Sequence, residues 1–417
     1  MHRPLCLCLL LFSPLAWAEP KPPLTLNAAV DLALARAPQL TAGSAALDAA
    51  QSLRISAGRL PDPEAVVGIE NLPVNGADSF STTRDFMTMR KVGVMQAFPA
   101  PGKRRLERVR ADAQVEVAGA ELAATRFDVA REAAMAWVRY AAALTAVERL
   151  CLIEPEAELA ATSARGAFKA GRASAADALA AEAAVIRLRS RLLQLQGDSD
   201  RSKAELARWI GDDAISTPAS MPSMDELPGS VEVLRESAHL HVGILPFDAR
   251  IAAAQVGVDI ARAERRPGWS AELSYAKRGP DFSDMASLQF TIDLPLFART
   301  RQNPMIAARS AEVRQLQAER DAELQMHRSE LQQMLISWQQ LGQQIALNEN
   351  EQLPLARERS RVALAAYRAG QGDLPPALAA FEEEAELLID RATLESGRAE
   401  AWTYLRYLDR TSPAGGH

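Results

Sequence analysis

The chain has 417 residues, of which 24% are charged and 5% are aromatic, and its formal net charge is −6. This mild acidity disfavours a nucleic-acid-binding protein, which would carry a basic face. The low aromatic content disfavours a large globular core, whereas abundant alanine suits close contact between long helices.

The first 18 residues have the pattern of a secretory signal. A positive start at Arg3 precedes an apolar run, Leu5–Phe12, which is too short to span a bilayer. Ala16-Trp17-Ala18 then matches the small-x-small rule for cleavage. We predict a signal peptide at 1–18 and an exported protein. The remaining chain keeps one cysteine, Cys151, so it has no internal disulfide.

The chain repeats itself at a nearly constant spacing. Ala167–Arg172 matches Ala366–Gln371 at an offset of 199 residues. Such a repeat indicates two similar structural units. We predict a first repeat at 19–214 and a second at 215–417.

Each repeat is predicted to contain a helical segment, two short strands and a long helical hairpin, in that order. In the first repeat these lie at about 26–59, 64–71, 86–98 and 104–210. In the second they lie at about 231–264, 268–276, 286–295 and 303–409.

The long helices have the spacing of a coiled coil. Apolar residues step alternately by three and four along both of them. The residues are Ala120, Ala123, Phe127, Ala130, Ala134, Trp137, Ala141 and Leu144, then Leu331, Met334, Trp338, Leu341 and Ile345. Proline is well placed at a helix start, so the hairpins are predicted to turn at Glu154-Pro155 and Gln352-Leu353-Pro354. Gly171 and Gly370 are predicted to bend or break the returning helices.

The second strand pair alternates cleanly between apolar and polar residues. Leu273 and Tyr275 alternate with Glu272 and Ser274, a pattern typical of transmembrane β-strands with lipid on one side and water on the other. The first pair is less regular, because Arg90-Lys91 interrupts it. A soluble hairpin with one face on a core is the alternative for any single pair. Four strands cannot close a barrel, and open edges are costly in lipid, so the pattern predicts an oligomer.

Four stretches, in this order and spacing, resemble the TolC-type outer-membrane efflux proteins. They are Leu24-Thr25-Leu26, Leu60-Pro61-Asp62-Pro63, Gln96 to Arg104, and Tyr367 to Leu374. The resemblance implies a mostly α-helical homotrimer, with a 12-stranded β-barrel in outer-membrane lipid above a 12-helix periplasmic barrel. It also implies two partners, a periplasmic adaptor protein and an inner-membrane efflux pump, and a passive export duct as the function.

Pro101-Gly102-Lys103 resembles the heavy-metal branch of that family, which serves cobalt–zinc–cadmium or copper–silver pumps. Heavy-metal cations are therefore the expected cargo. Two alternatives stay open: a drug or organic-toxin duct of the same architecture, and a soluble periplasmic coiled-coil adaptor or scaffold.

Charged residues gather at the predicted hairpin turns, where the family narrows its periplasmic mouth. The candidates for the aperture or for adaptor contact are Glu154, Glu156, Glu349, Glu351 and Arg357. In a trimer each inward acid becomes a ring of three that attracts cations. The alternative is an ordinary solvated turn.

Nothing in the sequence predicts an enzyme, a cofactor or a resident metal. Common hydrolase, metalloprotease, P-loop and dinucleotide motifs are lacking. His239-x-His241 and Met87-x-Met89 could bind metals, but a chance surface pair and strand-edge packing explain them better. Cys151 is expected to be a small packing residue.

Overall fold

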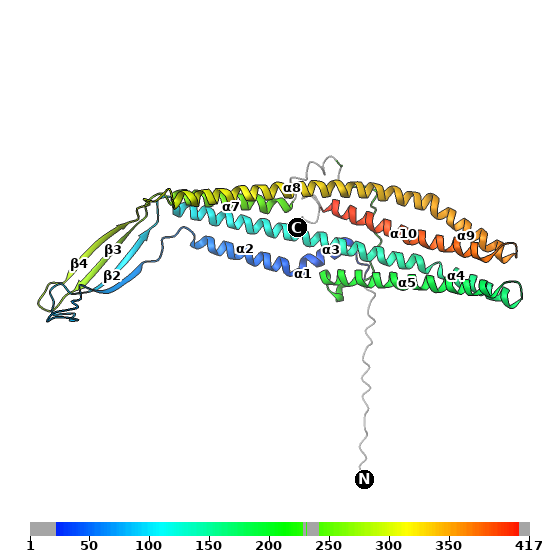
Figure 1. Ribbon diagram of the computed structural model, residues 1–417, viewed down its shortest axis with the longest axis horizontal. Coiled ribbons are helices and arrows are strands. Elements are labelled where there is room, and N and C mark those ends of the chain that lie inside the picture. Colours follow the sequence, from blue (N-terminus) through cyan, green and yellow to red (C-terminus); the bar gives the residue numbers. More distant parts are fainter. Residues whose placement is uncertain (1–21, 228–230, 232–241, 408–417) are drawn as a thin grey trace, which may run out of the picture.

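The computed structural model describes residues 22–227, 231 and 242–407. The molecule is an elongated rod with four strands at one end and two helical hairpins at the other (Figure 1). Among the described helices, none is long and apolar enough to cross a membrane. The predicted signal peptide at 1–18 lies outside the described residues.

The same order of elements occurs in both halves of the chain. The first half contains α1 (Leu26–Arg36), α2 (Pro38–Ser56), β1 (Glu64–Glu70), β2 (Met89–Phe98), α3 (Lys103–Cys151), α4 (Glu154–Lys169) and α5 (Ala175–Ile210). The short helix η1 (Asp212–Ala214) ends the first half. The second contains η3 (Val242–Ile244), α7 (Leu245–Ala263), β3 (Trp269–Lys277), β4 (Met285–Ile292), α8 (Gln302–Leu347), the π-helical η4 (Asn348–Gln352), α9 (Leu353–Arg368) and α10 (Leu374–Arg406).

The strands form one antiparallel sheet in the order β1-β2-β3-β4. The β2–β3 pair joins the two halves, with a register that runs from Arg90 opposite Lys277 to Phe98 opposite Trp269. The rings of Phe98 and Trp269 stack with centroids 4.1 Å apart. Each strand ends within three residues of its predicted bounds.

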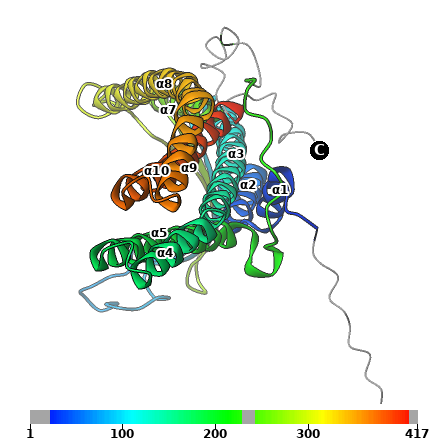
Figure 2. The same ribbon diagram turned by 90° about the vertical axis from the view of Figure 1, so that its right-hand side faces the viewer.

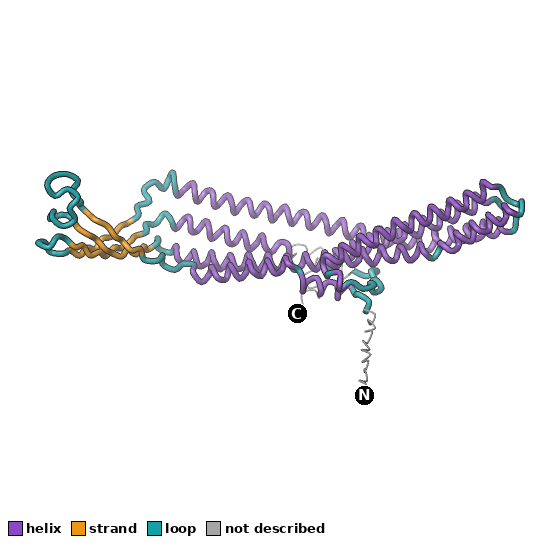
Figure 3. The backbone as a smooth tube through the Cα atoms, turned by 90° about the horizontal axis from the view of Figure 1, so that it is seen from below, coloured by secondary structure: helices purple, strands orange, loops and turns teal. Residues whose placement is uncertain are grey.

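Helix α3 runs through the middle of the rod. It packs against α2 and α7 near the strands, and against α5 and α10 farther along. Helix α8 packs against α7 and then α10. Figure 2 looks onto the hairpin ends and shows α4 with α5 as one pair and α9 with α10 as another. Figure 3 shows the same progression from strands through long helices to hairpins.

Small side chains line the buried seam of α3. The buried residues include Ala130, Ala133, Ala134, Ala136, Trp137, Ala141 and Ala142. Four of these belong to the predicted coiled-coil seam. Alanine permits close approach of neighbouring helices, because interaxial distance depends on the side chains at the contact.

Two tryptophans tie irregular chain to the middle of the long helices. The indole Nε1–H of Trp137 donates to the carbonyl of Leu24 at 2.9 Å. In the second half, Trp338 donates to the carbonyl of Met224 at the same distance. Trp137 is fully buried. These bonds fix the N-terminal segment and the segment between the halves at the waist of the rod.

Candidate functional site

The hairpin tips lie at two glycines, and the predicted turns are wrong. The chain continues from α3 into α4 past Glu154-Pro155, and from α8 into α9 past Gln352-Leu353-Pro354. It reverses only after α4 and α9, because α4 packs on α5 and α9 packs on α10. Proline in the first turn of a helix lets a helix restart without reversing the chain.

Both tips use the same backbone geometry. Gly171 and Gly370 have φ of +68° and +72°, a region that glycine adopts at little cost. The N–H of Gly171 donates to the carbonyl of Phe168, and that of Gly370 donates to Tyr367. The following N–H groups reach back to Ala167 and Ala366. This is the Schellman pattern, which satisfies the last carbonyls of a helix while the chain turns.

The returning helix α5 starts with a capping box. The hydroxyl of Ser174 accepts from the N–H of Asp177 at 3.1 Å, and the carboxylate of Asp177 accepts from the N–H of Ser174 at 3.1 Å. The Ser174 hydroxyl also donates to the carboxylate of Asp177 at 2.7 Å, and this bond, together with the one from the Ser174 N–H, lowers the pKa of Asp177 below its usual value. The first tip therefore carries a fixed negative charge at neutral pH.

The predicted aperture residues lie along the paired helices α3, α4, α5, α8, α9 and α10, here called the helical wall, instead of at the tips. Glu154 is 17 residues before Gly171, about 25 Å along a helix at 1.5 Å per residue. It pairs with Arg189 of α5 at 3.0 Å. Glu349 pairs with Arg391 of α10 at 3.1 Å, and Glu351 is exposed.

The most buried acid in this part of the wall is Glu384, which sequence reasoning missed. The predicted residue Arg357 donates to Glu384 at 3.2 Å, and Glu384 is 6% exposed. Burial raises the pKa of Glu384 above its usual value, opposed by Arg357 and reinforced by the charge of Glu156. Two of the predicted residues, Arg357 and Glu156, thus act on this carboxylate. Glu384 lies in an acidic run, Glu382 to Glu384, that has the sequence pattern of a solvated helix face.

We expect Glu384→Gln to stabilise the protein at neutral pH. A carboxyl whose pKa is raised in the folded state lowers the protein's free energy of unfolding as pH rises. The loss begins at the unfolded-state pKa, about 4.3, and continues through the folded-state pKa. The variant should therefore match wild type below about pH 4.3 and gain about 1–3 °C in melting temperature at higher pH. Melting curves by circular dichroism from pH 4 to pH 8 check this.

Glu383→Gln is the matched control for that prediction. Glu383 is about half exposed and pairs with Arg359 at 2.6 Å, so its replacement should give no gain that grows with pH. A Glu384→Gln protein that melts below wild type at pH 7 would show that the Arg357 pair outweighs burial.

Ion pairs between the two halves hold the wall together laterally. Arginines of the first half reach glutamates of α10 in the second half. The pairs are Arg139–Glu400 at 3.1 Å, Arg149–Glu395 at 2.6 Å and Arg187–Glu382. These charges neutralise each other within the chain.

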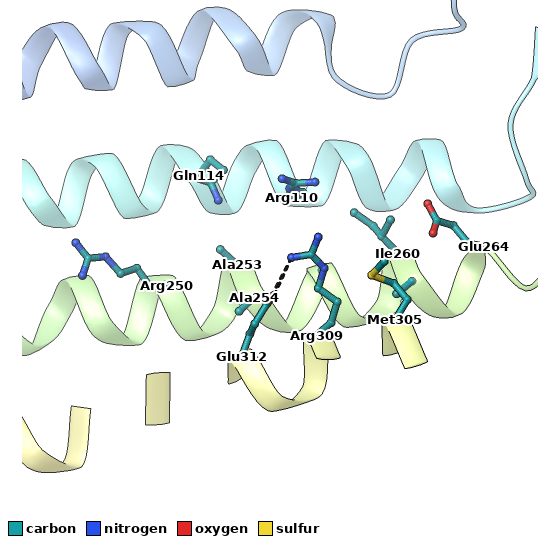
Figure 4. A pocket seen from close by; sticks show the side chains of 12 residues that line it. Arg110, Gln114, Arg250, Ala253, Ala254, Ile260, Glu264, Met305, Arg309 and Glu312 are labelled. Atoms are coloured by element: carbon teal, nitrogen blue, oxygen red, sulfur yellow. Dashed lines mark hydrogen bonds and ion pairs between the residues drawn. The ribbon is translucent and has the colours of Figure 1, made fainter. Parts of the chain in front are cut away.

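A groove of 450 Å³ lies between α3, α7 and α8 (Figure 4). Arg309 pairs there with Glu312 at 2.9 Å. Arg250 on the same lining pairs with Glu121 of α3 at 2.6 Å. The first pair lies within α8 and the second joins α7 to α3.

Exposed apolar side chains gather on one face of the sheet. On one face lie the exposed side chains of Val67, Ile69, Val92, Val94, Leu273, Tyr275, Leu288, Phe290 and Ile292. Lys91 points to the other face, where it pairs with Glu70 at 3.0 Å and Glu272 at 2.7 Å. The irregularity predicted at Arg90-Lys91 thus consists of two charged residues, of which Arg90 lies on the apolar face and Lys91 on the polar face.

The described residues contain no group of three or more His, Cys, Asp or Glu placed to hold a metal ion. His239-x-His241 lies outside the described residues. Met87 is exposed near the strand ends, and Cys151 is exposed at the end of α3, so it is not the packing residue that the sequence predicts.

The fold, a four-stranded sheet joined to long helical hairpins, is that of solved outer-membrane proteins. VceC, an outer membrane protein of Vibrio cholerae, superimposes with a TM-score of 0.76 at 22% identity, covering 92% of this chain and 95% of that one. No family model matches the chain.

Two curated proteins are similar to this chain in sequence. The cobalt-zinc-cadmium resistance protein CzcC of Cupriavidus metallidurans is 25% identical over 296 residues, which is 70% of this chain and 67% of CzcC. Protein CyaE of Bordetella pertussis is 27% identical over 326 residues, which is 73% of this chain and 68% of CyaE. The chain is thus similar in sequence to CzcC and CyaE, and similar in fold to solved outer-membrane channels.

Proposed function

We propose that the chain is one subunit of a homotrimeric passive duct in the outer membrane, through which an inner-membrane pump and a periplasmic adaptor export heavy-metal cations. The observation that carries the proposal is a sheet with an exposed apolar face and two open edges, joined to two long hairpins. Residues 1–18 direct export, and the repeats at 19–214 and 215–417 each supply two strands and one hairpin.

The open sheet edges support the trimer. Neither the outer edge of β1 nor that of β4 has a partner strand within the described part of the chain. Unpaired backbone groups cost several kcal/mol each in lipid. Pairing β4 of one copy with β1 of the next removes these edges, and three copies give a closed barrel of twelve strands.

Helices at both sides of the protomer carry exposed apolar side chains. On one side the exposed residues are Leu53 and Ile55 of α2 and Ile186 and Leu193 of α5. On the other they are Met326, Ile336 and Leu347 of α8 and Leu355 and Val362 of α9. Contact between these sides around the trimer would bury both and form the 12-helix periplasmic barrel.

The chemistry of the wall supports conduction, with no bond made or broken. We propose that Glu154, Glu156, Glu349, Glu351 and Arg357 act in the wall, about 20–30 Å from the tips. The adaptor then meets the exposed tips beside Gly171 and Gly370. Metal cargo is favoured over drugs because CzcC is named for cobalt, zinc and cadmium resistance.

The test is the sensitivity of a deletion strain, compared with the same strain carrying the gene again. Loss of resistance to cobalt, zinc, cadmium, copper or silver alone is expected. Sensitivity to dyes and antibiotics alone would replace the metal cargo with organic compounds. Light scattering of detergent-purified protein should give three chains per particle, and a buffer-soluble monomer would refute the duct and favour the adaptor or scaffold.

A further inference from the structure

Lys91 is confined although it lies on an open four-stranded sheet. Its side chain is 13% exposed, and its Nζ lies 3.0 Å from Oε1 of Glu70 and 2.7 Å from Oε1 of Glu272. Glu70 belongs to β1 and Glu272 to β3, so the lysine on β2 bridges three strands and both halves of the chain.

The neighbouring residues leave room for this bridge. Lys91 stands opposite Gly68 on β1 and Ala276 on β3. Two positions along β2, Gly93 stands opposite Ser274, and a Cβ at position 93 would lie 2.6 Å from the Cβ of Ser274. Small residues thus surround the lysine on the polar face, and its long side chain can lie flat across the strands.

We propose that Glu70, Lys91 and Glu272 form a charged clamp that lines the strand end of the duct and makes it favour cations. The proposal rests on the proposed function, because the trimer turns the apolar face to lipid and the clamp to the lumen. Each protomer contributes two carboxylates and one ammonium group, so a trimer carries a ring with a formal charge of −3. Rings of acidic side chains select cations, and lumen substitutions in barrels tune selectivity.

Lysine has two effects in this clamp. It holds the carboxylates in fixed positions, and it halves the negative charge of the ring. Removing it should therefore strengthen the cation preference, whereas removing both carboxylates should reverse the sign of the ring.

The experiment is the reversal potential of purified trimers in planar lipid bilayers under a potassium chloride gradient. Lys91→Met should raise the potassium-to-chloride permeability ratio about two- to threefold, and Glu70→Gln with Glu272→Gln should lower it by a similar factor. The triple variant with all three changes leaves no unpaired charge, so it covers the case in which Lys91→Met fails to assemble. Its potassium-to-chloride permeability ratio should fall below that of wild type.

Lys277→Met is the matched control. Lys277 stands one residue beyond Ala276 on β3, on the opposite face and exposed, so this change should leave the ratio unaltered. Channels whose ratio is the same in wild type and all clamp variants would overturn the clamp while leaving the duct intact. Wild-type protein that forms no channels would overturn the proposed function itself.

Discussion

Trp137→Ala is expected to destabilise the protein by about 3–5 kcal/mol, the range for removing a buried tryptophan side chain. Trp137 is fully buried, and its ring packs with the alanine seam of α3 and with the N-terminal helix α1. The same change removes one of two hydrogen bonds to the carbonyl of Leu24, which still accepts from the N–H of Ala219 at 2.9 Å.

Guanidinium unfolding followed by far-ultraviolet circular dichroism measures this loss. Trp137→Phe keeps most of the volume and loses only the hydrogen bond, so it should cost about 1 kcal/mol. Trp338→Ala removes the corresponding indole of the second half, which is only half-buried, and should cost less than Trp137→Ala. Equal losses for the two alanine variants would contradict the role assigned to burial.

Leu288→Arg is expected to abolish assembly in the outer membrane. Leu288 is 63% exposed at the centre of the apolar face, opposite Leu273. An arginine on the lipid side of a barrel costs about 2–4 kcal/mol at the bilayer midplane, and the proposed trimer would incur this cost in every copy. The amount of heat-modifiable trimer in the outer-membrane fraction measures the effect.

Gln289→Arg tests the same change one residue along β4 on the other face. Gln289 stands opposite Glu272 on the polar face, where an arginine meets water and a carboxylate. This variant should assemble at nearly the wild-type level. If both variants assembled equally well, the apolar face would not be in contact with lipid.

The strands and the helix seam could be predicted because both depend on local periodicity. Alternation with a period of two identified β3 and β4, and steps of three and four identified the buried face of α3 around Trp137. The resemblance to known efflux proteins supplied what periodicity cannot, namely the expected assembly and the class of function.

The hairpin tips were predicted wrongly because proline was given more weight than glycine. Pro155 and Pro354 lie in the first turn of α4 and α9, where proline is tolerated and the chain continues in the same direction. Gly171 and Gly370 supply the positive φ that a reversal needs. The available signal was a glycine followed three residues later by Ser174 or Asp373, which are a helix end and the next helix start in close succession.

Glu384 and the Lys91 clamp could not be found in the sequence for a different reason. Both depend on partners distant along the chain, Arg357 for one and Glu272 for the other. The sequence does not show that another helix covers the carboxylate of Glu384. It also does not show on which face of the sheet Lys91 lies.

The alanine seam of α3 also sets how wide a tube these helices can form. Twelve helices at an axial spacing of about 8 Å enclose a ring about 30 Å across, whereas a spacing of about 10 Å gives about 38 Å. After subtraction of one helix diameter of about 10 Å, the bores are about 20 Å and 28 Å. Alanines such as Ala133 and Ala136 are fully buried at the seam, so they favour the narrower bore. The calibre of the proposed tube is thus set by methyl groups inside its wall, and larger residues there would widen it without altering the surface that faces the cargo.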